Sequence, residues 1–500
     1  MRHFLLLLLF ASAAWQTLPA VRPNVLFISV DDMNDWINCL GGYAGKVHTP
    51  NLDRLAARGT LFTNAHCASP KCAPSRTALM TGLMPSSTGL YDNGHWWYPN
   101  MPEAVTLPMH FRNQGYKTVG AGKIHHHTAG SNPPHQWDEF QPLVFRDDPW
   151  FRTDKRNYPW SESGPNPPDF PFGGVKKLGH ENDWGSLPLA EEALDDVRTV
   201  DAALAHLKAE SDKPFFIACG LFRPHLPWYV PQAYFDMYKL DEIVLPAVFT
   251  ADLDDLPKPA SKLAADRRQD FEQIKKAGKW REAVRAYLAC ISFADAQIGR
   301  LLNALDEGPH AADTIIVLWS DHGWHLGEKQ HWHKSTLWER ATRVPLIISA
   351  PGFSPGRCAR PVNLIDLYPT LSELCQLPVV DGLDGISLAP LLRNPESVRE
   401  RPSVTEFLEG NAAVRDERYR YIRYHDGSEE LYDHQTDPHE WHNRADDPEM
   451  AAIKAGLLKW LPQSWAAAAP GKKAFVFDPV SHSWTEKASG RVFNPTDHKP

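Results

Sequence analysis

The sequence predicts an α/β fold in which helices sandwich a large, mostly parallel β-sheet, with a smaller antiparallel α+β part at the C-terminus. Short apolar runs typical of buried strands alternate along the chain with amphipathic helical segments. The 500 residues, 43% of them hydrophobic, can bury a large core. After about residue 395 the pattern changes to short strands with polar flanks. We therefore expect a large domain over residues 21–395 and a subdomain over 396–500.

Strands and helices of the large domain are expected to follow one another in βαβα order. An apolar run at 24–30 ends in two acidic residues, as a central parallel strand does when its carboxyl end opens into a site. Thr49 and Pro50 begin a helix, and Gly59 ends it. The other expected helices are 106–113, 194–207 and 284–305, and the other expected strands are 117–120, 214–219, 314–320 and 345–349. This order predicts a parallel sheet covered on both faces.

Two regions do not follow this alternation of strands and helices. Residues 127–188 are rich in Pro, Gly, Trp and Asp and show little periodicity. Their aromatic content argues against disorder, so we expect substrate-shaping loops that fold over the site. In the C-terminal part, the runs 418–424 and 430–433 predict antiparallel strands.

The first twenty residues have the pattern of a secretory signal peptide. Arg2 precedes an apolar run at 4–11, and small residues follow. We expect residues 1–20 to be removed and the protein to be secreted or periplasmic, an uncleaved anchor being the alternative. No later stretch is long and apolar enough to span a membrane. A net charge of -9 argues against a nucleic-acid partner, and the seven cysteines show no zinc-like or disulfide-framework spacing.

Acidic residues follow two of the expected strands, where ligands bind in open α/β sheets. Asp31 and Asp32 follow the first strand, and Asp321 and His322 follow the strand at 314–320. Either pair alone could cap a helix or lie on the surface. Together, three crowded carboxylates need a cation, and oxygen ligands of this charge suit Ca²⁺ or Mg²⁺. The imidazole of His322 is less usual for Ca²⁺.

Cys72 opens the run Cys-Ala-Pro-Ser-Arg, which continues to Thr81 and Gly82. The structural interpretation is a cysteine at a loop-to-helix junction, with Pro74 in the first helical turn. However, the run also resembles the signature that sulfatase maturation enzymes read when they oxidise a cysteine to formylglycine. The hydrated aldehyde of formylglycine carries two geminal hydroxyls. One can attack sulfur, and the other can later expel sulfate as the carbonyl forms again.

Further motifs, in the same order, resemble the type I formylglycine sulfatases of the alkaline-phosphatase-like superfamily. They lie at 25–32, 72–82, 122–126, 223–227, 320–324 and Lys334. The runs 90–92 and 326–328 and the Asp-His pair make the chain most similar to the iduronate-2-sulfatase branch. The likeness extends from about residue 23 to 438 and is loosest at 127–188 and 245–280. It implies that Ca²⁺, with Mg²⁺ as the alternative, is bound by Asp31, Asp32, modified Cys72, Asp321 and His322.

The resemblance also implies a catalytic role for several basic residues. Arg76 would hold the hydrate at residue 72, while Lys123 and Lys334 would neutralise the sulfuryl oxygens. His225 is expected to protonate the departing sugar oxygen, because a histidine with a near-neutral pKa can supply that proton.

A second histidine is expected to remove a proton from the other hydroxyl of the hydrate. The triplet 125–127 leaves its identity open. Many sulfatases place this histidine two residues after the lysine, which would select His125. The iduronate-2-sulfatase pattern places it three residues after and selects His126, which we prefer.

Two clusters are candidates for reading the substrate by charge and by ring stacking. The first follows the Asp-His pair and contains Trp324, His325, His331, His333 and Lys334. The second contains Asp92, His95, Trp96 and Trp97. For each tryptophan, ordinary core packing is the alternative.

These features predict an exported sulfatase that hydrolyses an O-sulfate ester of a carbohydrate. The resemblance favours an acidic sulfated glycan, because Trp324 and Lys334 fall at positions associated with the substrate carboxylate in the iduronate-2-sulfatase branch, and a fucose, rhamnose or hexosamine sulfate is the alternative. Its partners would be that substrate and a formylglycine-generating or sulfatase-maturating enzyme, with no nucleic acid and no membrane span. One alternative is a phosphonate monoesterase or phosphodiesterase of the same superfamily. The other is a non-catalytic protein that binds sulfated glycans and keeps Cys72 as a thiol.

Overall fold

The computed structural model describes residues 22–127, 130–143, 172–178, 182–187 and 190–495. The expected signal peptide at 1–20 lies outside these residues, as does much of the region at 127–188 that was expected to fold over the site.

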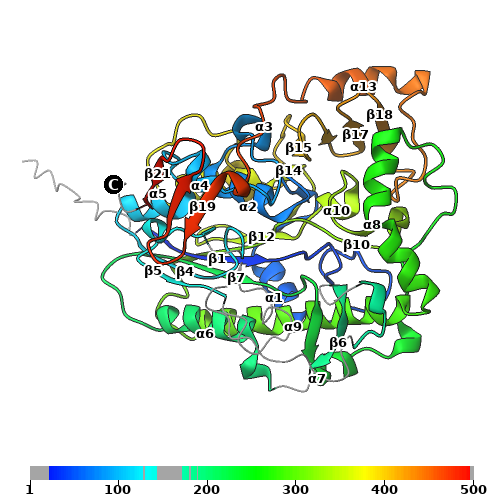
Figure 1. Cartoon of the computed structure of the whole chain (residues 1–500). Coiled ribbons are helices and arrows are strands. Elements are labelled where there is room, and N and C mark those ends of the chain that lie inside the picture. Colours follow the sequence, from blue (N-terminus) through cyan, green and yellow to red (C-terminus); the bar gives the residue numbers. More distant parts are fainter. Residues whose placement is uncertain (1–21, 128–129, 144–171, 179–181, 188–189, 496–500) are drawn as a thin grey trace, which may run out of the picture.

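An eight-stranded sheet forms the centre of the molecule (Figure 1). Its strands are β1 (Asn24–Val30), β2 (Thr60–Phe62), β4 (Lys117–Gly122), β5 (Glu139–Gln141), β7 (Phe215–Leu221), β9 (Thr314–Ser320), β12 (Leu346–Ser349) and β13 (Gly356–Cys358). They lie in the order β13-β2-β12-β9-β1-β7-β4-β5. Strand β12 pairs antiparallel with both of its neighbours, and the other pairs are parallel. The prediction of a mostly parallel sheet is confirmed.

Helices cover both faces of this sheet, because successive side chains of a buried strand point to opposite sides. Leu26 and Ile28 of β1 pack in a core with α1 (Pro50–Arg58), α6 (Asp195–Leu207) and α9 (Trp280–Asp306). Val25 and Phe27 pack in a second core with α2 (Cys72–Thr81), α5 (Leu107–Asn113) and α11 (Leu367–Leu374). Figure 1 shows α1, α6 and α9 below the sheet. The sequence predicted α1, α5, α6 and α9 within a few residues of these bounds.

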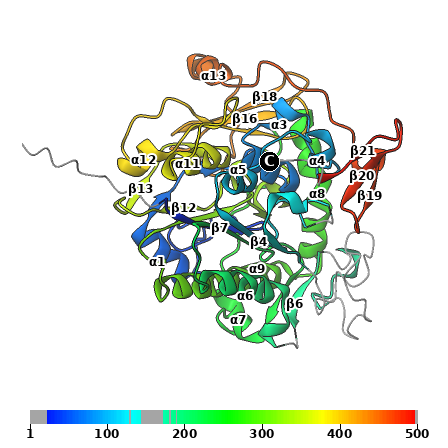
Figure 2. The ribbon, with the colours of Figure 1, turned by 90° about the vertical axis from the view of Figure 1, so that its left-hand side faces the viewer.

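The C-terminal part forms two antiparallel sheets that lie apart from each other (Figure 2). Strands β15 (Ser403–Glu406), β16 (Ala412–Arg415), β17 (Tyr419–Arg423) and β18 (Glu429–Asp433) make the first, beside α13 (Ala451–Leu458). Strands β19 (Phe475–Asp478), β20 (Ser483–Glu486) and β21 (Val492–Phe493) make the second. An antiparallel C-terminal part is thus confirmed, while the boundary at residues 395 and 396 stays a prediction.

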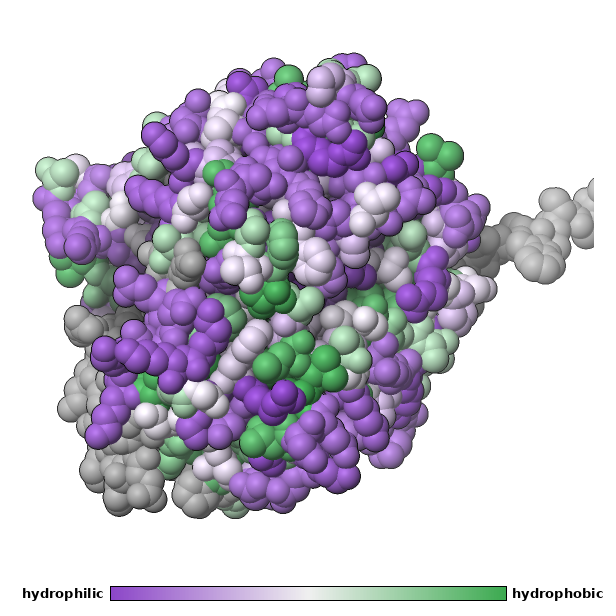
Figure 3. Space-filling view, turned by 90° about the vertical axis from the view of Figure 1, so that its right-hand side faces the viewer, coloured by the Kyte–Doolittle hydropathy of each residue, from purple (hydrophilic) through white to green (hydrophobic). Residues whose placement is uncertain are grey.

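Shorter elements connect these layers. The helices are α3 (Pro85–Thr88), α4 (Trp97–Asn100), α7 (Gln232–Asp236), α8 (Lys258–Lys276), α10 (Glu339–Thr342) and α12 (Ala389–Arg393). The strands are β3 (Ala65–His66), β6 (Trp184–Leu187), β8 (Trp228–Pro231), β10 (His325–Leu326), β11 (Trp332–His333) and β14 (Val362–Asn363). Among the described residues, no helix is both long and apolar enough to cross a lipid bilayer. The face shown in Figure 3 is hydrophilic over most of its area, with a smaller hydrophobic group near its centre.

A buried carboxyl group in β15 makes stability depend on pH. Glu406 accepts hydrogen bonds from the backbone N–H of Ser86 at 2.6 Å and from its hydroxyl at 2.7 Å. Burial raises the pKa of Glu406 to about 7. An acid whose pKa is raised by folding stabilises the fold fully below its unfolded pKa, and this stabilisation is lost as the pH rises through the folded pKa.

The free energy of unfolding of the wild type should therefore fall between pH 5 and pH 7.5. Glu406→Gln is expected to reduce this fall by up to about 3 kcal/mol. Urea unfolding midpoints at these two pH values provide the measurement. Glu409→Gln is the control, because Glu409 is exposed and the substitution changes the charge in the same way. Equal pH slopes for the wild type and Glu406→Gln would contradict the prediction.

Candidate active site

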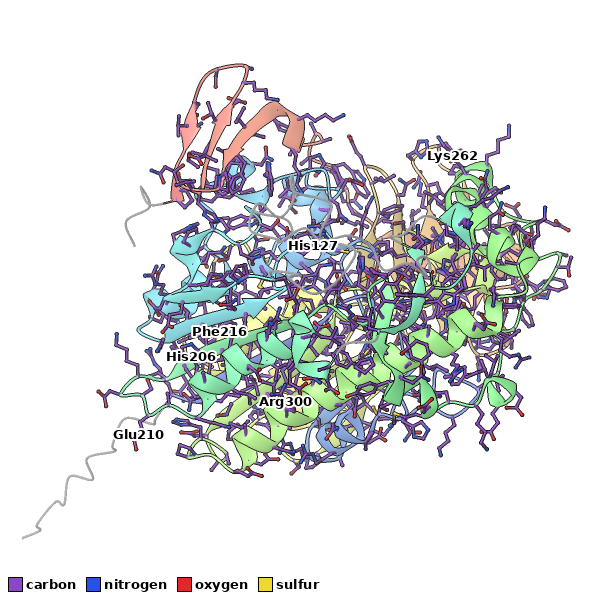
Figure 4. All side chains as sticks on the ribbon, turned by 60° about the horizontal axis from the view of Figure 1, so that its bottom comes forward. His127, His206, Glu210, Phe216, Lys262 and Arg300 are labelled. Carbon is purple, nitrogen blue, oxygen red and sulfur yellow. The ribbon has the colours of Figure 1, made fainter. Side chains whose placement is uncertain are left out.

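Two neighbouring strands bring the acidic pairs together. Strands β1 and β9 are parallel, with Val30 opposite Ser320, so the residues that follow them emerge side by side. The backbone N–H of Asp32 donates a hydrogen bond to Oδ1 of Asp321 at 3.0 Å. Figure 4 shows the orientation: Phe216 marks the beginning of β7, and His127 lies toward the opposite end of the strands. The candidate site lies at the carboxyl ends of the strands, as expected for an open α/β sheet.

The backbone of Asp32 has a left-handed conformation, with φ of 59°. For a residue other than glycine, this conformation persists where the surroundings hold it. The hydroxyl of Tyr287 donates to the carbonyl of Asp32 at 2.8 Å and accepts from the N–H of Asn34 at 2.9 Å. Tyr287 therefore positions the acidic loop from α9. Sequence reasoning counted it only as part of the helix's apolar stripe.

Cys72 is the first residue of α2 and is almost fully buried. Its Sγ lies 3.3 Å from Nε2 of His322 and 3.1 Å from Nζ of Lys334. The ligand atoms of Asp32, Cys72, Asp321 and His322 all lie within 4.8 Å of one another. The structure thus joins the cysteine motif with both strand ends.

Arg76 lies one turn further along α2 and ties the two acidic pairs together. Its guanidinium donates to Asp321 at 2.8 Å and to Asp31 at 3.2 Å. It also donates to the backbone carbonyls of Lys123 at 2.7 Å and Ile124 at 3.0 Å. Because these contacts occupy it, Arg76 orients the carboxylates and the end of β4 in this structure.

The three carboxyl groups differ in their electrostatic environment. Burial and the neighbouring Asp321 raise the pKa of Asp31 well above its ordinary value. For Asp321, burial acts in the same upward direction, but Arg76, His322 and Lys123 overcome it and lower the pKa well below the ordinary range.

The donor set fits a divalent cation. Asp31, Asp32 and Asp321 are fully buried, and Oδ2 of Asp32 receives no hydrogen bond from the described residues. Nε2 of His225 is 3.7 Å from that oxygen. Burying a carboxylate oxygen without a hydrogen-bond donor costs free energy, and a bound metal ion would offset that cost by coordinating the oxygen. Carboxylates with one imidazole form a plausible set for a hard cation.

Two lysines reach the same centre. The ammonium group of Lys123, at the end of β4, contacts the carboxylate of Asp31. Nζ of Lys334 lies 2.6 Å from Oδ1 of Asp32. Burial opposes the charge of Lys334, but Asp32 and Cys72 overcome it and raise the pKa of Lys334 above its ordinary value. Both lysines are placed to neutralise an anion beside Cys72.

The structure separates the three consecutive histidines. The ring of His125 stacks on Trp97, with centroids 5.1 Å apart, and its Nε2 lies 2.9 Å from Oε1 of Gln136. His125 is thus engaged in packing, which supports the choice of His126. The ring of His126 lies 4.1 Å from that of His127, which in turn lies 6.2 Å from that of His225. The sequence predicted no role for His127, although its ring lies beside those of His126 and His225.

His225 is held by a loop between β7 and β8. Asp196 of α6 accepts hydrogen bonds from the backbone N–H groups of Phe222 at 2.5 Å and Arg223 at 3.2 Å. Burial, Lys334 and Lys123 lower the pKa of His225 well below its ordinary value. The expectation of a near-neutral pKa is therefore wrong for the ligand-free site. An anionic ester entering beside His225 would raise it again.

Several expected substrate contacts are instead packed into the protein. His325 is fully buried, with one ring nitrogen 3.1 Å from the carbonyl of Glu328 and the other 2.9 Å from the hydroxyl of Thr336. The indole N–H of Trp97 donates to the carbonyl of Ser131 at 2.9 Å. In this arrangement neither side chain offers a surface for a sugar.

The remaining members of the first cluster support one another. The buried ring of Trp324 lies below Lys334, with Nζ 5.3 Å from its centroid. His333 lies 4.7 Å from the same ring and 3.0 Å from Oδ2 of Asp270. His331 is engaged with two backbone carbonyls. Lys334 is therefore the member of this cluster that reaches Cys72.

The members of the second cluster gather around Asp92. Nζ of Lys71 is 2.5 Å from Oδ2 of Asp92. Burial opposes ionisation of Asp92, but Lys71 overcomes it and lowers the pKa of that carboxyl. The N–H of Asp92 donates to Nδ1 of His95 at 3.3 Å. Lys472, just before β19, also reaches this cluster, and no local sequence signal indicates it.

Comparisons with known proteins agree with this geometry. The model of the sulfatase family matches residues 23–377, and one described as N-sulphoglucosamine sulphohydrolase, C-terminal, matches residues 327–466. A sulfatase of Formosa agariphila is 38% identical over 455 residues, which cover 88% of this chain and 87% of that protein. Iduronate 2-sulfatase of Homo sapiens is 32% identical over 403 residues, covering 71% of this chain and 69% of that protein.

Solved structures share the fold. The phosphonate monoester hydrolase of Agrobacterium radiobacter has a TM-score of 0.71 and 24% sequence identity, covering 91% of this chain and 98% of that one. At this identity the likeness concerns the architecture alone, which is the alkaline-phosphatase-like fold with a C-terminal subdomain. The family match, by contrast, spans both strand ends and the cysteine motif that meet around Cys72. The chain therefore belongs to the sulfatase family and is a sulfuric ester hydrolase.

Proposed function

We propose that this chain is an exported sulfatase that hydrolyses an O-sulfate ester of an acidic sulfated carbohydrate. The nucleophile would be a formylglycine made from Cys72, beside Ca²⁺ held by Asp31, Asp32, residue 72, Asp321 and His322. One observation carries the proposal. The Sγ of Cys72 lies within 3.3 Å of His322 and 3.1 Å of Lys334, at the meeting point of the buried carboxylates.

The thiol itself cannot complete the reaction, because a sulfated cysteine has no second hydroxyl with which to expel sulfate. A hydrated formylglycine supplies both hydroxyls. The sequence at 72–76 has the form that a formylglycine-generating enzyme would read, so that enzyme is the proposed maturation partner. A bound divalent cation would acidify a hydroxyl and polarise a sulfate oxygen.

The charged side chains hold the ester in place. Lys123 and Lys334 approach from two strand-end loops and are placed to neutralise the sulfuryl oxygens as charge redistributes. Arg76 keeps the carboxylates of Asp31 and Asp321 oriented from below. Trp324 supports Lys334 from its ring face. In this proposal the two lysines bind the ester, and Arg76 and Trp324 support the side chains around it.

Two histidines would move protons. His225 would donate to the departing sugar oxygen, since an alkoxide is a poor leaving group. It would take up that proton when the anionic ester raises its pKa. Burial, His127 and Lys123 lower the pKa of His126 well below its ordinary value, so its imidazole is neutral and has a nitrogen lone pair that can accept a proton. His126 would remove the proton whose loss releases sulfate.

The substrate class is argued from charge. Lys71 directly precedes Cys72 and forms an ion pair with Asp92 of the second cluster, and an acidic sugar would complement the charge of Lys71. Human iduronate 2-sulfatase, whose name states an acidic sugar, is among the similar proteins. Export is proposed from the pattern at residues 1–20.

The test compares matched sulfate and phosphate esters with the same leaving group, using protein coexpressed with a formylglycine-generating enzyme. Peptide mass spectrometry across Cys72 first establishes the modification. We expect sulfate to be preferred by at least about a thousandfold. A panel of sulfated monosaccharides with and without a carboxylate then identifies the substrate class.

Three results would contradict the proposal. A large preference for phosphate would favour the phosphonate monoesterase or phosphodiesterase alternative. An unmodified Cys72 in material from a competent host, together with no turnover, would favour a binding protein. Faster release of sulfate from neutral sugars than from acidic ones would contradict the proposed substrate class.

A further inference from the structure

Two short loops carry the acidic residues of the proposed metal site. The first loop, residues 31–34, follows β1, and the second loop, residues 321–324, follows β9. Arg76 connects one carboxylate of the first loop with one of the second. Without a cation between them, however, the buried carboxylates of the two loops repel one another. The contacts that join the backbones of the loops therefore help to determine how far apart the metal ligands lie.

The side chain of Asn34 joins the two loops. It is fully buried. Its Nδ2 donates a hydrogen bond to the backbone carbonyl of Trp324, in the second loop, at 3.0 Å. Its Oδ1 accepts a hydrogen bond from the backbone N–H of Trp36 at 3.0 Å, which fixes the orientation of the amide. Both polar ends of this side chain thus bond to backbone groups, and one of these bonds crosses from the first loop to the second.

Ser320, the last residue of β9, makes a second link between the loops. Its hydroxyl accepts a hydrogen bond from the backbone N–H of Met33 at 3.0 Å and donates one to the backbone carbonyl of His322 at 3.1 Å. One fully buried hydroxyl therefore bonds to both loops. Because Met33 directly follows Asp32, this link acts on the backbone that carries the proposed metal ligands.

Both ends of the first loop are also anchored by other elements. Asp35, which follows the loop, accepts hydrogen bonds from the guanidinium groups of Arg340 and Arg343, the latter at 3.0 Å. These two arginines lie on α10 and directly after it. Tyr287 holds the loop through the carbonyl of Asp32. With these anchors in place, loss of a link to the second loop should shift the first loop without unfolding it.

We propose that Asn34 and Ser320 are positioning residues that hold the two loops at the separation which the divalent cation requires. The inference rests on the proposed function, because it assumes that these loops bind a cation. It assigns part of the affinity for that cation to two neutral side chains that are not among its proposed ligands. A cation binds tightly only to molecules whose loops are correctly spaced, so its apparent dissociation constant rises as the fraction of such molecules falls.

Asn411 provides a matched control for a purely structural role. Its amide is also buried, and it donates to the carbonyl of Phe407 at 2.9 Å and accepts from the backbone N–H of His425 at 3.1 Å. These contacts lie in turns between strands of the first C-terminal sheet. Asn411→Ala should therefore lower the stability about as much as Asn34→Ala does, but it should leave cation binding unchanged.

The test measures Ca²⁺ binding directly in the wild type and in Asn34→Ala, Ser320→Ala and Asn411→Ala. Each full-length protein is coexpressed with a formylglycine-generating enzyme, freed of cations with EDTA and dialysed. Isothermal calorimetry gives the dissociation constant for Ca²⁺, and unfolding temperatures without Ca²⁺ give the change in stability. Release of sulfate from an aryl sulfate is then measured over a range of Ca²⁺ concentrations.

The dissociation constant for Ca²⁺ should rise by roughly tenfold or more in Asn34→Ala and in Ser320→Ala, because groups that orient metal ligands typically contribute factors of this size. Asn411→Ala should bind Ca²⁺ as the wild type does. Sulfate release by Asn34→Ala should recover toward the wild-type rate when Ca²⁺ exceeds the new dissociation constant, since the proposed ligands and the nucleophile are unchanged.

Other results would count against the inference. A wild-type dissociation constant in either variant would remove that residue from the role, and in both variants it would overturn the inference. An equal rise in Asn411→Ala would also overturn it, because the weaker binding would then follow from lost stability. If Asn34→Ala does not fold, Ser320→Ala decides the result. Failure of the wild type to bind Ca²⁺ would instead refute the metal site of the proposed function, and the inference with it.

Discussion

Cys72→Ala is expected to lower sulfate release by roughly 10⁴-fold or more, because it removes the proposed nucleophile, on which every later step of the proposed reaction depends. The fold should survive. Cys72 begins α2 and contributes little apolar area, and the helix is held by Arg76 and by the left-handed Gly82 at its end, with φ of 71°. Release of sulfate from a matched ester and thermal unfolding followed by circular dichroism provide the two measurements.

Cys67→Ala is the matched control. Cys67 is also buried and lies five residues earlier, but it packs in the core below the site. This variant should retain turnover with at most a modest loss of stability, on the order of 1 kcal/mol. Retained turnover in Cys72→Ala would refute the proposed nucleophile. Loss of the folded state in that variant would instead require the test to be repeated with serine at position 72.

Removing divalent cations with EDTA should lower turnover by at least about a hundredfold and reduce the unfolding temperature. Without a cation, three buried carboxylates and His322 crowd together, and the Asp31 carboxyl is driven toward its protonated form. Added Ca²⁺ should restore both properties, and the order of recovery with Ca²⁺ and Mg²⁺ identifies the preferred ion. Isothermal calorimetry measures binding independently of activity.

Asp321→Asn supplies the control for this prediction. The substitution keeps the size of the side chain but weakens a proposed ligand, so Ca²⁺ should no longer raise the unfolding temperature of this variant. If EDTA leaves the wild type active and equally stable, the proposed metal site is wrong. An equal Ca²⁺-dependent shift in Asp321→Asn would place the ion at a cluster without Asp321, and the described residues offer two: Asp31 with Asp32 and His225, and Glu339 with His434 and Glu440.

Local patterns were sufficient to predict the frame of the molecule. The apolar runs of β1 and β9 are each followed by acidic residues. A parallel sheet brings the carboxyl ends of neighbouring strands together, so the sequence alone was enough to group Asp31, Asp32 and Asp321. The antiparallel insertion of β12 was not foreseen. A short apolar strand has the same composition in either direction, and its orientation depends on the connection that leads to it.

Contacts made across long sequence distances were the part that could not be predicted. Tyr287 supports Asp32 from a helix whose periodicity shows only that it is buried. Lys472 contacts the ring of Trp96 from beyond the first C-terminal sheet, and its own neighbourhood in the sequence carries no motif. Burial also sets the chemistry of residues that the sequence motifs single out. The pKa of His225 depends on Lys334 and Lys123, which a list of histidines does not reveal.

The burial of Cys72 limits when this protein can be activated. The side chain is 1% exposed, beneath loops contributed by several strands. If the modifying enzyme must bind residues 72–76 as an extended peptide, the folded protein does not present this segment to it, because the segment is helical and buried. Conversion would then have to precede folding, and chains that collapse first would remain permanently inert. The specific activity of a preparation would therefore depend on how fast Cys72 is converted relative to folding in the producing cell. Slower synthesis or a higher level of the modifying enzyme should raise that activity.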